Sequence, residues 1–302
     1  MLLVCLVSNV SVLANEDSDE QKPYVVKEFT LNGAGILKTF TTAGNIDVQS
    51  TYNTDKVRVE LYVERGYAIW SGSRNLDNYR INILQRGNEI IASVEEKKRS
   101  GGLFSEKVNF NFRIYVPERM STELKTLGGN IKLSRLTGDQ MAKTSGGNII
   151  LHSLKGKIGA YTSGGNIEIT SSRGTIFAQT EGGNISVDRT EGELRLRTAG
   201  GDIIAEHTTG SFIARADAGN IKGHFIDVGQ GISMETSAGN IFAELPGNTG
   251  LTLSASGSHI SFDQMEHFTG RKEQQLLEGK LNDGGIPISL QTSSGTITIK
   301  TN

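Results

Sequence analysis

Apolar and polar residues alternate over short runs along much of the chain. Ile149 and Leu151 are two positions apart, and Ile167 and Ile169, with Glu168 between them, repeat the spacing. A period of two residues predicts β-strands rather than helices. The runs are about five residues long and end at glycines, so the pattern predicts many short strands joined by tight turns.

The alternating runs recur with a fixed period. Gly-Gly-Asn-Ile occurs at 146, 164 and 182, and its asparagine position belongs to an evenly spaced series whose last step alone is slightly longer. The series is Asn130, Asn148, Asn166, Asn184, Asp202, Asn220 and Asn240. A second glycine series lies midway, so that the unit is nine residues long and is used in pairs. A fixed period over this length predicts a solenoid.

The predicted fold is all-β: a parallel β-solenoid with coils of about 18 residues and two short strands per coil. Coils would stack about 4.8 Å apart around an aliphatic core, and right-handed winding is the default for parallel crossovers. Glycine and asparagine both suit the corners. The asparagine series would form a structural ladder of amides bonded to one another along the axis, and Asp202 would accept from the amides of Asn184 and Asn220.

The chain divides into four predicted parts. Residues 1–14 are a short apolar run ending in Val-Leu-Ala, which predicts a signal peptide although no basic residue precedes it. Residues 15–23 form a polar linker. Residues 24–120 are predicted to be an N-terminal β cap with enlarged coils. Residues 121–302 are the solenoid array, with a polar C-terminal insertion at 264–285 that has room for a short helical turn.

Charge and cysteine content exclude several classes of function. The 302 residues carry 31 Lys and Arg against 33 Asp and Glu, a balance that argues against a nucleic-acid partner. Cys5 is the only cysteine, so a processed chain would have no disulfide and no thiolate metal site. Calcium-binding nonapeptides need a carboxylate where this repeat carries core residues. We therefore expect no metal and no cofactor.

One outward column on the asparagine-bearing strands contains groups that could carry out chemistry. It consists of Ser134, His152, Thr170, Asp188, Glu206 and His224. Two carboxylates about 5 Å apart suit a retaining glycosidase, and with histidine they could hold a metal. The alternative is a solvated face of mixed charge, which the near absence of loops over the array favours.

The other strands present a predicted binding face. Its residues are Lys143, Tyr161, Phe177, Arg195, Arg197 and Arg215. Aromatic rings interleaved with cations suit an acidic glycan, a lipid head group or a protein surface. The alternative is an ordinary exposed face with no ligand.

The repeats "TxGGNI", the opening "GAGILKTFTTAGNIDVQS" and the ending "GKLNDGGIPISLQTSSGTITIK" resemble a bacterial family of β-strand-repeat proteins. That family has no established function and often carries the provisional label adhesin, and it is similar to the head domains of autotransporter-like adhesins. The resemblance covers residues 25–302. It implies an exported β-helical envelope protein, and it brings no catalytic residues.

These observations predict an exported, non-enzymatic β-solenoid in the periplasm, on the cell surface or secreted. It would present a face for adhesion, or for interaction with an envelope glycan or protein. Two alternatives stay open: an enzyme acting on polysaccharide, and a structural or regulatory protein of the envelope. No transmembrane segment is expected.

Overall fold

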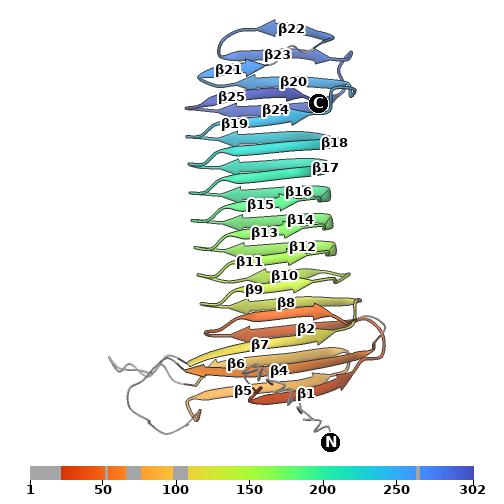
Figure 1. The fold of residues 1–302 in the computed structure, drawn as a ribbon, viewed down its shortest axis with the longest axis vertical. Coiled ribbons are helices and arrows are strands. Elements are labelled where there is room, and N and C mark those ends of the chain that lie inside the picture. The colour runs from red at the N-terminus through yellow and green to blue at the C-terminus, as the bar shows by residue number, and fades with distance from the viewer. Residues whose placement is uncertain (1–21, 52–53, 66–75, 98–107, 263–265) are drawn as a thin grey trace, which may run out of the picture.

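The computed structural model describes residues 22–51, 54–65, 76–97, 108–262 and 266–302. The predicted signal peptide at 1–14 and most of the linker at 15–23 lie outside these ranges. The described residues form 25 β-strands and contain no helix, which confirms the all-β prediction. Figure 1 shows the strands stacked along one long axis, with β1 near one end and β22 at the other.

Most strands pair in parallel, in two columns, with strands one repeat away. Ile158 lies opposite Ile176 in the first column, and Ile167 lies opposite Ile185 in the second, so that each residue faces its equivalent in the next repeat. We call one strand of the first column and the next strand of the second column a coil. The mostly parallel, solenoid-like pairing agrees with the prediction, whereas right-handed winding stays a prediction.

The first column contains, in spatial order, β6 (Glu89–Glu96), β2 (Gly35–Thr41), β8 (Met120–Thr126), β10 (Gln140–Lys143), β12 (Lys155–Thr162), β14 (Arg173–Thr180), β16 (Glu191–Thr198), β17 (Ile203–Ala216), β18 (Ile221–Thr236), β24 (Ile286–Thr292) and β20 (Leu251–Ser256). The second contains β7 (Val108–Val116), β3 (Ile46–Ser50), β9 (Ile131–Ser134), β11 (Ile149–His152), β13 (Ile167–Thr170), β15 (Ile185–Asp188), β17, β18, β19 (Ile241–Leu245), β25 (Thr296–Thr301) and β21 (His259–Phe262). β17 and β18 turn a corner without a break and belong to both columns.

The core is a set of aliphatic lines that run along the axis. Ile149, Ile167 and Ile185 face one another on successive coils and are at most 1% exposed. One buried cluster includes residues from Leu31 to Ile299, so the whole stack shares a single interior. A single coil buries too few side chains to be stable alone, and each coil therefore depends on its neighbours.

The corners use two kinds of residue. Gly165 approaches the previous coil so closely that a Cβ there would overlap the carbonyl oxygen of Gly147, and Gly174 has a φ of 127°. In the five central coils, the corner that follows the strand of the second column has a left-handed backbone without glycine, at Arg135, Ser153, Ser171, Arg189 and His207. Asparagine was expected to share the left-handed corners, and this is wrong for the ladder asparagines: none has a positive φ.

The end coils are not stacked in chain order. The β2–β3 coil lies between β6–β7 and β8–β9. At the other end, β24 and β25 lie between β18–β19 and β20–β21. Figure 1 shows both insertions as breaks in the colour sequence along the stack.

Antiparallel strands cover both ends. They are β1 (Val25–Thr30), β4 (Lys56–Arg65) and β5 (Tyr79–Arg86) at one end, and β22 (Phe268–Lys272) and β23 (Leu276–Leu281) at the other. Residues 266–285 of the predicted insertion form β22 and β23 and contain no helical turn. Arg271 and Lys272 are exposed on β22, and such charges protect an edge strand from pairing with other chains.

Candidate functional site

The asparagine ladder is held by hydrogen bonds from backbone N–H groups to side-chain oxygens, whereas the sequence predicts bonds between side-chain amides. The Oδ1 of each asparagine accepts the backbone N–H of the equivalent residue on the next coil, as between Asn148 and Asn166 at 2.8 Å. The predicted amide-to-side-chain bond occurs once in the described structure, from Asn220 Nδ2 to Asp202 Oδ1 at 3.2 Å. Asp202 accepts nothing from Asn184 and instead donates its own N–H to that residue.

The ladder is longer than the predicted series. Asn45 donates its N–H to Asn111 Oδ1 at 2.7 Å, and Asn130 donates to Asn45 Oδ1 at 2.8 Å. At the far end, Thr296 donates to Asn240 Oδ1. The motif "TTAGNIDV" could have identified Asn45, but Asn111 has no glycine before it and only the strand pairing reveals it. The amide oxygens are used within the ladder, and the exposed side chains can turn their NH₂ donors to solvent.

The predicted binding face is brought together by the strand registers. Lys143, Tyr161, Gln179, Arg197 and Arg215 follow one another on adjacent strands. A neighbouring line holds the predicted face residues Phe177 and Arg195, again directly opposite each other. We call the six predicted residues, Lys143, Tyr161, Phe177, Arg195, Arg197 and Arg215, the cation–aromatic face.

Rings and cations on this face are arranged by short contacts. Tyr161 and Phe177 stack with their centroids 5.3 Å apart. Arg195 pairs with Glu193 at 2.6 Å, and Arg215 pairs with Glu235 at 3.2 Å. Because these pairs are exposed, each contributes only about 0.2–1 kcal/mol to stability. The arginines are therefore available to exchange their partners for a ligand.

Two shallow hollows mark the cation–aromatic face. One, of about 320 Å³, lies above Gly159, where Met141, Tyr161 and Phe177 form an apolar wall. The other, also about 320 Å³, lies between Phe177 and the arginines. Met141 and Tyr161 lie close over Gly159, where an added Cβ would press on both side chains, so glycine lets them approach the strand.

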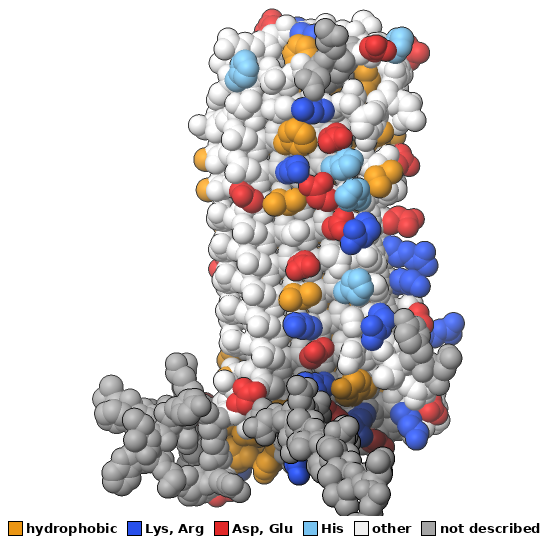
Figure 2. All heavy atoms as spheres, viewed as in Figure 1, with side chains coloured by type: hydrophobic (Ala, Val, Ile, Leu, Met, Phe, Trp, Pro, Cys, Tyr) orange, Lys and Arg blue, Asp and Glu red, His pale blue; other side chains and the backbone are white. Residues whose placement is uncertain are grey.

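The carboxylate and histidine column is a network of ion pairs. Asp188 contacts Arg189 at 2.8 Å and His207 Nδ1 at 2.9 Å. Glu206 contacts Lys222 at 2.8 Å and His224 at 3.6 Å. Figure 2 shows histidines beside acidic and basic side chains in lines along the long axis. His207 was assigned to no column by the sequence, although it continues the corner series of Arg135, Ser153, Ser171 and Arg189 at the same period.

The described residues contain neither a candidate metal site nor a candidate membrane-spanning helix. No group of three or more His, Cys, Asp and Glu side chains there is arranged to hold a metal ion. None of the elements described there is a helix with the length and hydropathy needed to cross a membrane.

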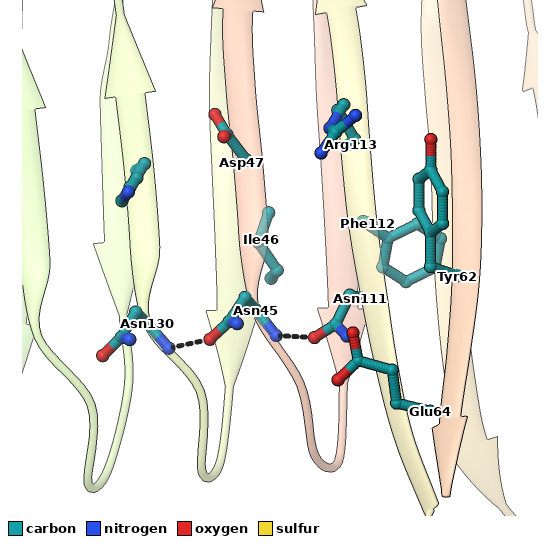
Figure 3. A pocket seen from close by; sticks show the side chains of 10 residues that line it. Asn45, Ile46, Asp47, Tyr62, Glu64, Asn111, Phe112, Arg113 and Asn130 are labelled. Atoms are coloured by element: carbon teal, nitrogen blue, oxygen red, sulfur yellow. Dashed lines mark hydrogen bonds between the residues drawn. The ribbon is translucent and has the colours of Figure 1, made fainter. Parts of the chain in front are cut away.

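A further hollow has no counterpart among the sequence predictions. It measures about 370 Å³ and lies where β4 joins the stack, beside the β3 and β9 strands. Figure 3 shows Asp47 and Arg113 on neighbouring strands, with Tyr62 on the next strand and the ladder asparagines below. The Arg113 guanidinium lies 5.2 Å from the Tyr62 ring centroid. These residues come from distant segments, so no local motif predicts the hollow.

The pKa values of two carboxylates near this hollow are shifted in opposite directions. Burial raises the pKa of Asp47, and the nearby charges of Lys132 and Arg113 only partly offset it. Burial also opposes the ionised form of Glu60. There, hydrogen bonds from Arg58 and Tyr62, at 2.7 and 2.8 Å, outweigh burial and hold the pKa below its ordinary 4.5.

Replacing Glu60 with glutamine is expected to reduce stability at neutral pH by about 1.5–3 kcal/mol, because hydrogen bonds to a charged group are lost. A lowered folded pKa contributes stability above pH 4.5 that disappears as the pH falls through the folded value. The difference between the two proteins should therefore shrink in acid. Denaturant titrations from neutral pH to well below 4.5 measure it. Glu28→Gln is the control, since Glu28 meets the same Arg58 but is 56% exposed; a difference that widens in acid would contradict this account.

Comparisons with solved structures find similar proteins at low identity. One from Clostridium sporogenes, provisionally assigned to cell adhesion, is 14% identical over 93% of this chain and 100% of its own, with a TM-score of 0.23. A provisional adhesin from Bacteroides fragilis is 16% identical over 92% and 96%, with a TM-score of 0.40. A provisional lipid-binding protein from Parabacteroides distasonis is 12% identical over 92% and 97%, with a TM-score of 0.36.

No functionally curated protein matches the chain significantly. The model of one family, by contrast, matches residues 9–300, nearly the entire sequence. This match confirms the resemblance to a β-strand-repeat family of unknown function, and the chain belongs to the Toastrack DUF4097 family.

Proposed function

We propose that this protein is an exported, non-enzymatic, right-handed β-solenoid that binds a glycan or protein of the cell envelope through its cation–aromatic face. The observation that carries the proposal is the register of β10, β12, β14, β16 and β17, which aligns rings and cations from separate coils on one surface. A rigid stack holds these side chains in place without loops. Such preorganisation lowers the entropy lost on binding.

The column of Asp188 and Glu206 supports a binding role rather than hydrolysis. A glycosidase needs one carboxyl group protonated and the other ionised. Here each carboxylate is engaged by its own cation, Arg189 or Lys222, so neither is set apart as the acid or the nucleophile. We therefore favour binding over the polysaccharide-acting enzyme.

Export is part of the same proposal. The apolar run at 1–14 supports it, because its length and its Val-Leu-Ala ending are typical of a secretory signal. Fractionation of cells that produce the full chain should place it outside the cytoplasm. Retention of the chain in the cytoplasm with residues 1–14 still attached would contradict this part.

Reversing three charges, as Arg195→Glu, Arg197→Glu and Arg215→Glu together, is expected to weaken envelope binding by about ten- to hundredfold, since several exposed ion pairs are lost and repulsion is added. Binding of the full chain to glycan panels and isolated envelope fractions measures the effect. The matched control reverses three cations elsewhere, Lys155, Arg173 and Lys222. Equal losses in the two triple variants would show that net charge, not this face, determines binding.

A further inference from the structure

The cation–aromatic face belongs to a longer straight line of side chains. Strand registers place six residues directly opposite one another on consecutive strands of the first column, from β8 to β17. We call this set the cation line: Lys125, Lys143, Tyr161, Gln179, Arg197 and Arg215. Phe40 precedes it and Glu235 follows it in the same register. No carboxylate interrupts it.

The line has a fixed repeat and length. Adjacent strands are about 4.8 Å apart, and five intervals give about 24 Å from Lys125 to Arg215. The pairings between β8 and β16 contain no register shift, so the line stays straight. A ligand that follows it must be linear and must repeat with nearly the rise of a coil.

Most cations on the line have no carboxylate partner among the described residues. Lys143 and Arg197 are exposed and make no ion pair with any described residue. Lys125 lies 5.9 Å from the Phe40 ring centroid, a weak contact at a solvent-exposed site. Arg215 alone has a carboxylate partner, Glu235, where the line ends. Four cations in one row therefore attract a polyanion.

An apolar platform interrupts the cations at the middle of the line. Tyr161 stacks on Phe177, and Met141 lies beside them around the hollow above Gly159. Aromatic faces of this kind contact the C–H faces of sugar rings, which a chain of bare phosphates cannot provide. The combination of rings in the middle and cations on both sides favours an acidic sugar polymer.

We propose that the cation line binds a linear polyuronic acid, an unbranched polysaccharide with one carboxylate on each sugar, laid parallel to the solenoid axis. This inference rests on the proposed function and names its ligand class. An extended sugar residue is about as long as the rise of one coil. Carboxylates of the polymer would meet Lys125 and Lys143 at one end of the line and Arg197 and Arg215 at the other, while a central sugar stacks on Tyr161. Each added sugar within the line brings one more contact.

The test uses the full chain and galacturonate oligomers of defined length, shorter than, equal to and longer than the six-coil line. Affinity should rise by about a hundredfold or more from the shortest to the matched oligomer and then level off, as for linked binding sites. The double variant Lys143→Glu and Arg197→Glu should lose this length dependence. Lys155→Glu with Arg173→Glu is the control, because these two cations face each other at the far end of β12 and β14, the strands that carry Tyr161 and Gln179 of the line.

Three results would overturn the inference. One is an affinity that does not change with oligomer length. Another is equal weakening by the control variant, which would mean that the net charge alone determines the affinity. The third is equally tight binding of carboxyl-reduced oligomers, or of single-stranded DNA of matched length, which would remove the match to a uronate. If the triple arginine variant still loses envelope binding in these cases, the proposed function stands and its ligand is another molecule. If that variant keeps envelope binding, the proposed function and this inference both fail.

Discussion

Gly165→Ala is expected to destabilise the protein by about 4 kcal/mol or more, the range in which single substitutions are exceptional. The new methyl group would overlap the carbonyl oxygen of Gly147, which is backbone and cannot rotate away. That carbonyl also accepts the buried Thr162 hydroxyl at 2.9 Å. Relief would have to separate two coils and break hydrogen bonds along the stack. Thermal and denaturant unfolding, followed by circular dichroism, measure the loss.

The adjacent residue provides the control. A Cβ at Gly164 would have the carbonyl oxygen of Ser145 as its nearest neighbour, at 3.9 Å, which is ordinary contact. Gly164→Ala should therefore change stability by no more than about 0.5 kcal/mol, as for other surface substitutions. Equal unfolding midpoints for the two alanine variants would show that the coils are farther apart than described.

Ile167→Asp is expected to have an effect at least as large. The side chain is 1% exposed and lies between Ile149 and Ile185, so a carboxylate there would be buried without a partner. Burying an unpaired charge costs more than losing the apolar contact alone. Because coils are stabilised by their neighbours, the array should unfold at a lower temperature in one cooperative step.

The matched control places the same residue on the outside. Ile204 lies on β17 next to the core residue Ile203, but it is 39% exposed. Ile204→Asp should leave the unfolding midpoint nearly unchanged. If Ile167→Asp were equally mild, the inward orientation of the aliphatic lines would be wrong.

The middle of the molecule was predictable because its repeat is local. The constant period fixes which residues lie opposite each other, and Lys143, Tyr161 and Arg197 could be assigned to one surface by counting. Counting back one further period would have identified Lys125 as well. The hydrogen-bond type in the ladder was not predictable, since Asn166 could equally have bonded a side chain or a backbone N–H.

The ends were not predictable because their contacts join distant segments. Phe40 lies beside Lys125 only because β2 pairs with β8, and no period connects the two. The hollow of Figure 3 likewise had no signature in the sequence. It forms because β3 and β4 both pair with β7, which brings together Asp47, Tyr62 and Arg113.

The inserted coil near the C-terminal end constrains the order of assembly during translation. A ribosome delivers residues 251–281 before residues 286–301, yet the later segment occupies the place between the earlier one and β18–β19. Until it emerges, β18 and β19 expose unpaired backbone groups that another nascent chain could occupy. Completion of the stack thus waits for residues 286–301, and a chain cut near residue 285 would lack a layer inside the stack rather than a tip.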